Sequence, residues 1–498
     1  MDLFNNLFFG FSVALSLQNL FYCFIGVLVG TLIGVLPGIG PLGTIAILLP
    51  ITYSVSPVAA MIMLAGIYYG AQYGGSTTAI LVNLPGETSA VVTCIDGYQM
   101  AQQGRAGPAL AIAAIGSFFA GTVGTLLIAL FGPPLADVAL KFGAPEYFSL
   151  MLMGLIAAAV LAQGDMVKSI AMVVMGLLLG IIGTDVNSGV QRFSFGFFEL
   201  TDGIGFIVVA VGVFAIGEIV SNLGDKQERR VLSTKVSHLF PSWQDLKQSW
   251  APIVRGTGLG CFFGVLPGTG PAIASFSSYM LEKKISKTPE RFGKGAIEGV
   301  AGPEAANNAD AQCKFIPMLT LGLPASGVMA LMLGALTIQG IQPGPQVMTQ
   351  RPELFWGLIA SMWIGNLMLV VLNLPLIGLW VKLLQVPYRL LFPAIMAFSA
   401  IGIFSVNNSA FEIHLTALFG VLGFIWMRLG FPLAPMLLGF VLGPMMEEYL
   451  RRAMLMSGGD ATVFVTRPLS AVFIVATVLI LVVMVAPSVR KRREAFTD

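Results

Sequence analysis

Two five-residue motifs in this sequence combine proline and glycine in a way that interrupts helices and exposes backbone amides. Proline has no N–H to donate within a helix, whereas glycine permits positive φ and close approach of other backbone atoms. A helix that restarts beyond such a break points free N–H groups and its positive dipole end at an anion. A kink that only lets helices pack closely is the alternative. We predict that the motifs bind an anionic substrate through Pro37, Gly38, Gly40 and Pro41, and through Pro267, Gly268, Thr269, Gly270 and Pro271.

A run of small and hydroxylated residues follows the first motif. Gly75, Ser76, Thr77 and Thr78 are consecutive, and Asn83 lies a few residues further on. Hydroxyl groups are costly in apolar surroundings unless they find hydrogen-bond partners. We predict that Ser76 and Thr77 contact the substrate, and that Gly75, Thr78 and Asn83 coordinate an ion such as Na⁺ through oxygen atoms. The alternative is that the hydroxyls bond back to carbonyls of their own helix.

The second half of the chain has a polar counterpart to this run. Asn307 and Asn308 are adjacent amides, with Glu304 and Asp310 close by in the sequence and Ser326 beyond them. An amide offers its carbonyl oxygen to a cation and its N–H groups to an anion. We predict that Asn307 contacts the substrate and that Asn308 and Ser326 contribute to ion binding. A solvated loop is the alternative for this polar stretch.

The composition indicates that these residues are positioned in a lipid bilayer and not in water. Of 498 residues, 56% are hydrophobic and only 10% are charged, and the mean hydropathy is +0.85. Soluble domains carry about 25% charged residues. No Asp, Glu, Lys or Arg occurs between residues 3 and 86, a stretch long enough for several passages of about 20 residues each. We therefore predict an all-α polytopic membrane protein with about 12 membrane segments. The net charge of +2 argues against nucleic acid as a partner.

The sequence also contains an internal repeat. Residues 34–41 recur 230 residues later at 264–271 with seven identities in eight positions. Further matches follow in the same order, pairing residues 83–86 with 322–325 and 134–135 with 375–376. An ordered series of this kind predicts a duplication. We divide the chain into a first transmembrane repeat at 1–220, a cytoplasmic linker at 221–249, a second transmembrane repeat at 250–489 and a basic cytoplasmic tail at 490–498.

The distribution of charge predicts that the two repeats have inverted topology. Short loops rich in Lys and Arg stay cytoplasmic, which places residues 283–294 on that side. The matching first-half loop, 51–57, carries no charge, so it is expected on the opposite side. Residues 251–281 have basic flanks at both ends and extend about 46 Å as helix, too short for two crossings of about 30 Å each. We predict a re-entrant hairpin there and a mirrored one at 20–57.

These residues together resemble a known transporter family. The paired Gly-Val-Leu-Pro-Gly-x-Gly-Pro motifs, the Tyr-Gly-Gly-Ser-Thr-Thr run and Gly-Pro-Glu-Ala-Ala-Asn-Asn-Ala at 302–309 are similar to the large TctA-type subunit of bacterial tripartite tricarboxylate transporters. The likeness extends from about Leu20 to Arg428 and is least specific over the last part of the chain.

The resemblance implies partners, a driving force and a location. It implies a periplasmic solute-binding protein and a small membrane subunit of about four spans. It implies import of citrate-like di- or tricarboxylates, or related organic acids, by symport with Na⁺ or H⁺ across the bacterial inner membrane. No cofactor and no metal beyond a coupling Na⁺ is expected, and no Walker A loop occurs in the sequence.

Other functions remain to be weighed against this one. A passive anion channel is the main alternative, since Gly/Pro-broken hairpins also build selectivity filters. A membrane enzyme or redox-complex subunit is disfavoured by the presence of only two histidines and the lack of any paired metal-ligand spacing. A structural scaffold would leave the polar, broken helices unexplained.

Overall fold

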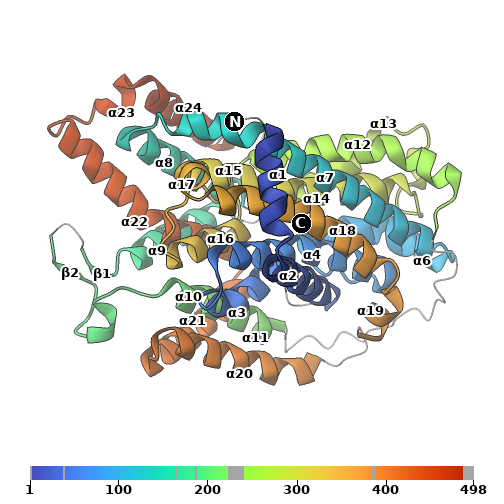
Figure 1. The fold of residues 1–498 in the computed structure, drawn as a ribbon, viewed down its shortest axis with the longest axis horizontal. Helices are drawn as coiled ribbons and strands as arrows, with labels where there is room; N and C mark the ends of the chain where they lie inside the picture. Colours follow the sequence, from blue (N-terminus) through green and yellow to red (C-terminus); the bar gives the residue numbers. More distant parts are fainter. Residues whose placement is uncertain are drawn as a thin grey trace.

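The first half of the chain is mostly helical in the computed structural model, with a longer segment between α9 and α10 that carries the strands β1 and β2 (Figure 1). The structure describes residues 3–36, 40–162, 165–185, 188–222, 240–383 and 388–485. Short 3-10 and π-helical turns interrupt the series at Thr88–Ala90, Cys94–Tyr98, Phe198–Leu200 and Val211–Ile216. The helices are α1 (Leu3–Ala14), α2 (Leu17–Val35), α3 (Pro41–Thr52), α4 (Pro57–Val82), α5 (Val91–Thr93), α6 (Gln99–Gln102), α7 (Ala106–Ala139), α8 (Ala144–Leu161), α9 (Met166–Gly180), α10 (Phe206–Ala210) and α11 (Gly217–Asn222).

The second half continues in the same manner. Its helices are α12 (Trp243–Val265), α13 (Pro271–Ile285), α14 (Glu298–Cys313), α15 (Phe315–Leu321), α16 (Gly327–Ile338), α17 (Gln346–Gln350), α18 (Pro352–Asn373), α19 (Ile377–Leu383), α20 (Tyr388–Asn407), α21 (Ala410–Arg428), α22 (Leu433–Met456), α23 (Val463–Thr466) and α24 (Pro468–Val485), with a 3-10 turn at Pro289–Arg291. The described strands are β1 (Gly183–Thr184) and β2 (Gln191–Arg192), which pair antiparallel with Gly183 opposite Arg192.

Four helices in the described part of the chain, α2, α7, α18 and α21, are long and apolar enough to cross a membrane. Shorter apolar helices accompany them, among them α1, α3, α8, α9, α16 and α24. Helices satisfy their own backbone groups, as the interior of a bilayer requires. The architecture is therefore that of an all-α membrane protein. The count of about 12 segments, the re-entrant course of the hairpins and the inverted orientation of the repeats stay predictions.

Both Pro-Gly motifs separate two helices. Helix α3 begins at Pro41 directly after Gly40, and α13 begins at Pro271 directly after Gly270. Each glycine has extended backbone, so the chain changes direction before the new helix starts. Proline suits the first helical position because its φ is preset and no intrahelical donor is needed there. The motifs thus create two helix pairs, which we call hairpin 1 (α2 and α3) and hairpin 2 (α12 and α13).

Matching glycine stripes attach each hairpin to the next long helix of its own repeat. Helix α2 packs along α4, and α12 packs along α14. At each stripe position an added Cβ would overlap a backbone carbonyl of the facing helix. Small residues four apart allow this backbone-to-backbone approach in membrane helices. The stripes lie 230 residues apart, like the motifs, and consist of Gly26, Gly30 and Gly34 in α2 and of Gly256, Gly260 and Gly264 in α12.

The two halves also end their central helices alike. Helix α4 ends at Asn83 with φ 57°, and α15 ends at Gly322 with φ 69°. Both residues are left-handed C-caps, a conformation that Gly and Asn adopt at low cost. The predicted correspondence of residues 83–86 with 322–325 thus has a common backbone basis. The second half nevertheless differs, because α14 and α15 share the role of the continuous α4 and meet at Lys314.

The predicted cytoplasmic linker at 221–249 includes the first residues of helix α12. Helix α12 begins at Trp243, inside the predicted linker. A capping box explains this start: the Asp245 amide donates to the Ser242 hydroxyl at 3.1 Å, and the Ser242 amide donates to the Asp245 carboxylate at 3.0 Å. Residues 223–239 and the basic tail at 490–498 lie outside the described residues.

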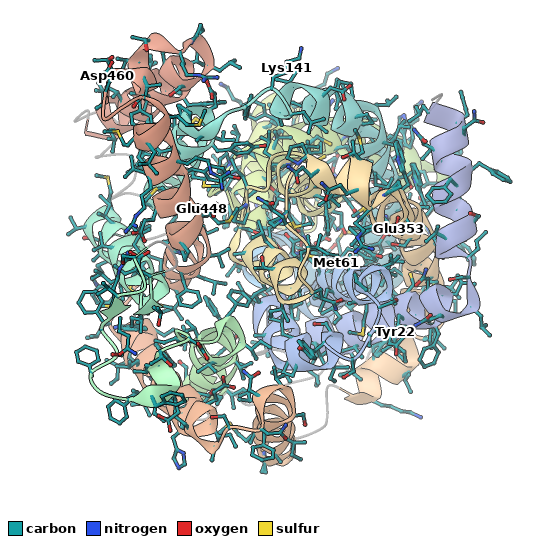
Figure 2. All side chains as sticks on the ribbon, turned by 60° about the vertical axis from the view of Figure 1, so that its left-hand side comes forward. Tyr22, Met61, Lys141, Glu353, Glu448 and Asp460 are labelled. Atoms are coloured by element: carbon teal, nitrogen blue, oxygen red, sulfur yellow. The ribbon has the colours of Figure 1, made fainter. Side chains whose placement is uncertain are left out.

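Helices α4 and α14 form the interior of the molecule. Helix α4 is buried along nearly its whole length, and so is α14. Figure 2 shows Met61 of α4 in the densely packed middle, whereas Glu448 and Asp460 lie on outer segments. Both central helices carry polar residues that the surrounding helices shield from lipid. This arrangement is typical of a membrane protein with an internal polar site.

The glycine stripes generate a stability prediction. Replacing Gly260 by alanine places a Cβ against the Ala306 carbonyl and the Ala309 side chain, so α12 must move away from α14. We expect a loss of about 1–3 kcal/mol, typical of overpacking, measured as a lower melting temperature in detergent. Gly258→Ala is the matched control on the same helix, because a Cβ there meets nothing within 4 Å. Equal melting temperatures for the two variants would contradict close packing at the stripe.

Candidate functional site

A single cavity of about 720 Å³ lies between the two hairpins. This volume falls within the range of roughly 300–1,000 Å³ found for small-molecule sites. Hairpin 1 contributes Gly40 and Pro41 to the wall. Hairpin 2 contributes residues 268–271, and further lining residues come from α4, the turn after α4, Val91, the end of α8, Phe214, α11, the start of α16 and residues 427–438. Residues from both halves of the chain therefore enclose one space.

At hairpin 1 the start of α3 is already occupied by a carboxylate. Glu218 of α11 accepts a hydrogen bond from the Gly40 amide through Oε1, at 3.1 Å. Its second oxygen, Oε2, would lie 2.9 Å from a Cβ added at Gly43, so glycine there makes room for the carboxylate. A negative group at a helix N-terminus is favourable because it meets unpaired N–H groups and the positive dipole end. The chain thus supplies its own anion to this helix.

At hairpin 2 the start of α13 faces the cavity without such a carboxylate. Gly268 has φ 81° and donates its amide to the Ala325 carbonyl at 3.0 Å. The Thr269 hydroxyl donates to the carbonyls of Phe263 and Leu266, at 2.5 and 2.8 Å, and so closes the end of α12. A Cβ added at Gly270 would meet nothing within 4 Å. The first turn of α13 is therefore open to a ligand in the cavity.

A turn after α4 brings a second carboxylate, Glu87, to the cavity wall. Gly86 packs so closely on Gly34 and Gly75 that a Cβ on it would overlap both backbones. Glu87 then accepts hydrogen bonds from the Ser89 hydroxyl at 2.6 Å and from the Asn307 amide at 3.3 Å. The three glycines thus fix the position of this carboxylate. The sequence analysis assigns Glu87 no role.

Two polar groups near this turn lack hydrogen-bond partners among the described residues. Gln72 lines the cavity, and its Oε1 accepts from the Ser89 hydroxyl at 3.2 Å while its Nε2 has no partner. Asn307 is fully buried, and its Oδ1 is likewise without a partner. Buried polar atoms in native proteins are rarely left unpaired. The pair of open amide atoms, one donor and one acceptor, points to a ligand that completes them.

The hydroxyl run mostly follows the alternative of the sequence analysis. Ser76, Thr77 and Thr78 each donate to the carbonyl four residues earlier in α4. Ser76 also donates to Glu304 at 2.5 Å, and Thr78 also donates to the Gly34 carbonyl at 3.2 Å. Ser76 and Thr77 line a separate, much smaller cavity of about 10 Å³. None of the three residues lines the large cavity: Ser76 and Thr78 join α4 to neighbouring helices, and Thr77 bonds within α4.

Of the other predicted site residues, Ser326 lines the large cavity, and Asn308, Asn83 and Pro267 do not. Ser326 lies on the large cavity wall, where its hydroxyl accepts from the Met329 amide at 3.4 Å. Asn308 donates to the Ser117 hydroxyl at 2.7 Å and to the Glu304 carbonyl at 3.1 Å. Asn83 caps α4, and Pro267 is not among the residues that line the cavity. Pro37 and Gly38 lie outside the described residues.

The polar stretch around Asn307 is a buried helix and not a solvated loop. Every residue of α14 from Gly299 to Cys313 is buried. Glu304 accepts hydrogen bonds from Ser76 and Thr93, which links α14 to the first repeat. Asp310 forms an ion pair with Lys314, and both side chains are completely buried. A buried charge requires a partner of this kind.

Sequence reasoning did not identify Glu218, Gln72 or Lys314. Glu218 directly follows residues 203–217, a stretch without any Asp, Glu, Lys, Arg or His. An ionisable group at the end of such an apolar segment is itself a signal of function, and it was available in the sequence. The bond from the Gly40 amide to Glu218 joins residues 178 positions apart, which no local pattern reveals. No group of three or more His, Cys, Asp or Glu in the described ranges is placed to hold a metal ion.

Comparison with known proteins identifies the family. The family described as "Tripartite tricarboxylate transporter TctA family" matches residues 20–438, which include both hairpins and the whole cavity wall. The chain belongs to the TctA family. This confirms the resemblance noted from the motifs and makes the chain a multi-pass membrane protein of a transporter family.

Two relatives of this TctA-family chain come from Agrobacterium vitis. One, named "Uncharacterized 52.8 kDa protein in TAR-I ttuC' 3'region", is 59% identical over 494 residues, covering 99% of this chain and 98% of the relative. The other, "Uncharacterized protein in TAR-II ttuC' 3'region", is 59% identical over 235 residues, covering 47% of this chain and 97% of the relative. No solved structure matches the chain.

The left-handed turn of hairpin 2 generates the second prediction. In Gly268→Ala the residue must keep φ 81° with its Cβ 2.5 Å from the Ala158 Cα. Strained backbone of this kind costs about 1–3 kcal/mol, and relief requires the turn to move away from α8. We expect a lower melting temperature than for Gly270→Ala, whose Cβ meets nothing within 4 Å. A melting temperature for Gly268→Ala at or above that control would contradict the close contact of this turn with α8.

Proposed function

We propose that this chain is the large membrane subunit of a secondary transporter that imports a di- or tricarboxylate such as citrate, or a related organic acid anion. Membership of a tripartite tricarboxylate transporter family supports this assignment. The observation that carries it is the single cavity to which both Pro-Gly motifs contribute. Non-helical backbone within a membrane protein is tolerated where it is buried or lines a cavity, and such breaks are where transporters bind their substrates.

The substrate carboxylate binds at the start of α13. That helix has an open first turn at Gly270, whereas the equivalent turn of α3 is occupied by Glu218. Gln72 lines the same cavity, but its unpartnered Nε2 is buried, so the start of α13 is the donor group that the anion meets at the cavity surface. Gly268, Thr269 and Gly270 shape this site, while Ser76 and Thr78 hold the helices around it.

The transporter works with partners and an ion gradient. A periplasmic solute-binding protein delivers the anion, and a small membrane subunit of about four spans completes the complex in the bacterial inner membrane. Both partners follow from the tripartite organisation in the family name. A cation gradient, of Na⁺ or H⁺, drives uptake, and Asn307 and Ser326 lie where they can contribute to cation binding. Unwound backbone and buried amides are common cation ligands in such carriers.

The function is tested by reconstituting the chain with its small subunit in proteoliposomes. We expect binding-protein-dependent uptake of radiolabelled citrate or succinate under an inward cation gradient, and exchange of internal for external carboxylate when the gradient is absent. Saturable exchange identifies a carrier. Conductance that does not saturate, with no requirement for the binding protein, would instead identify a channel and overturn the proposal.

Replacement of Asn307 tests the internal site within this assay. Asn307→Ala removes the amide that donates to Glu87 at 3.3 Å and leaves that carboxylate with fewer partners. We expect gradient-driven uptake to fall by about two orders of magnitude or more, equivalent to a loss of about 3 kcal/mol, without loss of membrane insertion. Asn407→Ala is the control, because Asn407 is exposed at the end of α20 and bonds Glu412. Wild-type uptake by Asn307→Ala would remove this residue from the site.

A further inference from the structure

The ionisable carboxyl groups on the cavity wall are acidic, whereas an anionic substrate is attracted by positive charge. Glu87 and Glu218 are the carboxylic acids on its wall, and no described residue lining it is Lys, Arg or His. Lys314, a buried cation on the hairpin 2 side, is already paired with Asp310 one helical turn away. The start of α13 offers the equivalent of only about half a positive charge. A carboxylate entering the cavity would therefore meet a net negative wall, and like charges repel strongly in such surroundings.

Glu87 has the surroundings of a cation site. Its Oε1 accepts hydrogen bonds from the Ser89 hydroxyl and from Asn307 Nδ2. The other atom of that amide, Asn307 Oδ1, is buried and has no partner among the described residues. A carboxylate beside an unpaired amide oxygen provides the hard oxygen donors that alkali and alkaline-earth cations prefer. A proton on the carboxylate would neutralise the same group.

Glu218 occupies a comparable position on the other side of the cavity. Its one hydrogen-bond partner in the described structure is the Gly40 amide, and Gly43 leaves space beside its Oε2. This contact joins α11 to the start of α3, so neutralising Glu218 weakens the contact between the carboxylate and the helix dipole. A cation bound at Glu218 therefore changes the charge of the cavity and also weakens the contact between Glu218 and the start of α3 in hairpin 1.

We infer that Glu87 and Glu218 take up the cations that travel with the substrate, and that the anion occupies the cavity only when these carboxylates are neutralised. The inference rests on the proposed function and names the coupling sites within it. Each site uses the same chemistry, a positive charge on a carboxylate oxygen, whether the cation is Na⁺ or H⁺. Anion binding and cation binding then favour one another, because each lowers the electrostatic cost of the other.

The ionisable neighbours of the two groups differ. Glu87 is surrounded by Glu304 and Asp310 of α14, by Lys314 at the end of that helix and by Tyr68 of α4. The helix that carries Glu218, α11, packs on α21, whose ionisable residues are Glu412, His414 and Arg428. None of these α21 side chains bonds Glu218 in the described structure. Replacing each glutamate by glutamine therefore shows how much of the protein's response to cations comes from Glu87 and Glu218 and how much comes from these neighbours.

The first experiment measures cation binding without any carboxylate substrate. The melting temperature of the purified full-length chain is followed against Na⁺, with choline as the replacement cation, and separately against pH. Ligands that bind the folded state raise its melting temperature. We expect stabilisation by Na⁺ or by protons, and we expect Glu87→Gln and Glu218→Gln to weaken that response about tenfold or to abolish it. The Na⁺ and pH series distinguish the two cations.

Glu448→Gln provides the matched control. Glu448 lies on the outer helix α22 (Figure 2), with 58% of its side chain exposed, and pairs with Arg452. This variant should respond to Na⁺ and pH as the wild type does. The inference is wrong if Glu87→Gln and Glu218→Gln also respond to both cations as the wild type does, whichever solute the protein transports.

The second experiment compares net uptake with exchange in proteoliposomes. A coupling residue is required for accumulation against a gradient but much less for one-for-one exchange of solute. We expect accumulation in the two glutamine variants to fall at least tenfold while exchange falls no more than a few-fold. Equal loss of both activities would contradict a coupling role. If the wild type exchanges no carboxylate, yet its cation response needs both glutamates, the substrate assignment fails and the cation sites stand.

Discussion

The constraint on which the rest of the structure depends is that backbone amides exposed at a helix break must find partners away from bulk water. The two hairpins meet this constraint differently. Gly268 gives its amide to a neighbouring backbone carbonyl, whereas Gly40 gives its amide to the side chain of Glu218. Each of these hydrogen bonds requires a segment from elsewhere in the chain to lie against the helix break. The cavity is the space that remains between these segments, so its existence follows from how the breaks are satisfied.

The sequence was sufficient to predict the helical membrane class, the position of both helix breaks and the family. These features have local causes: apolar runs, and proline next to glycine at the start of a helix. The hydroxyl run was harder to interpret, because a serine or threonine in a helix always has a carbonyl four residues earlier within reach. Glu218 and Gln72 were missed because a cavity wall assembles residues that are distant in sequence, and their meeting depends on packing that no single segment encodes.

The predicted duplication would account for the resemblance of the two halves, which is not complete. The glycine stripes and the left-handed caps at Asn83 and Gly322 keep the same backbone geometry in both. The two helix starts differ although both lie on the cavity wall: the start of α3 holds the Glu218 carboxylate, and the start of α13 holds no carboxylate in the described structure.

The glycine stripes have a mechanical consequence. Helices that touch backbone to backbone cannot rotate or slide past one another without steric overlap, so α2 stays with α4 and α12 stays with α14. Each hairpin therefore travels as one rigid body with its long partner helix. In the carrier that we propose, alternating exposure of the cavity to the two sides of the membrane would occur at softer boundaries, where larger and more deformable side chains meet.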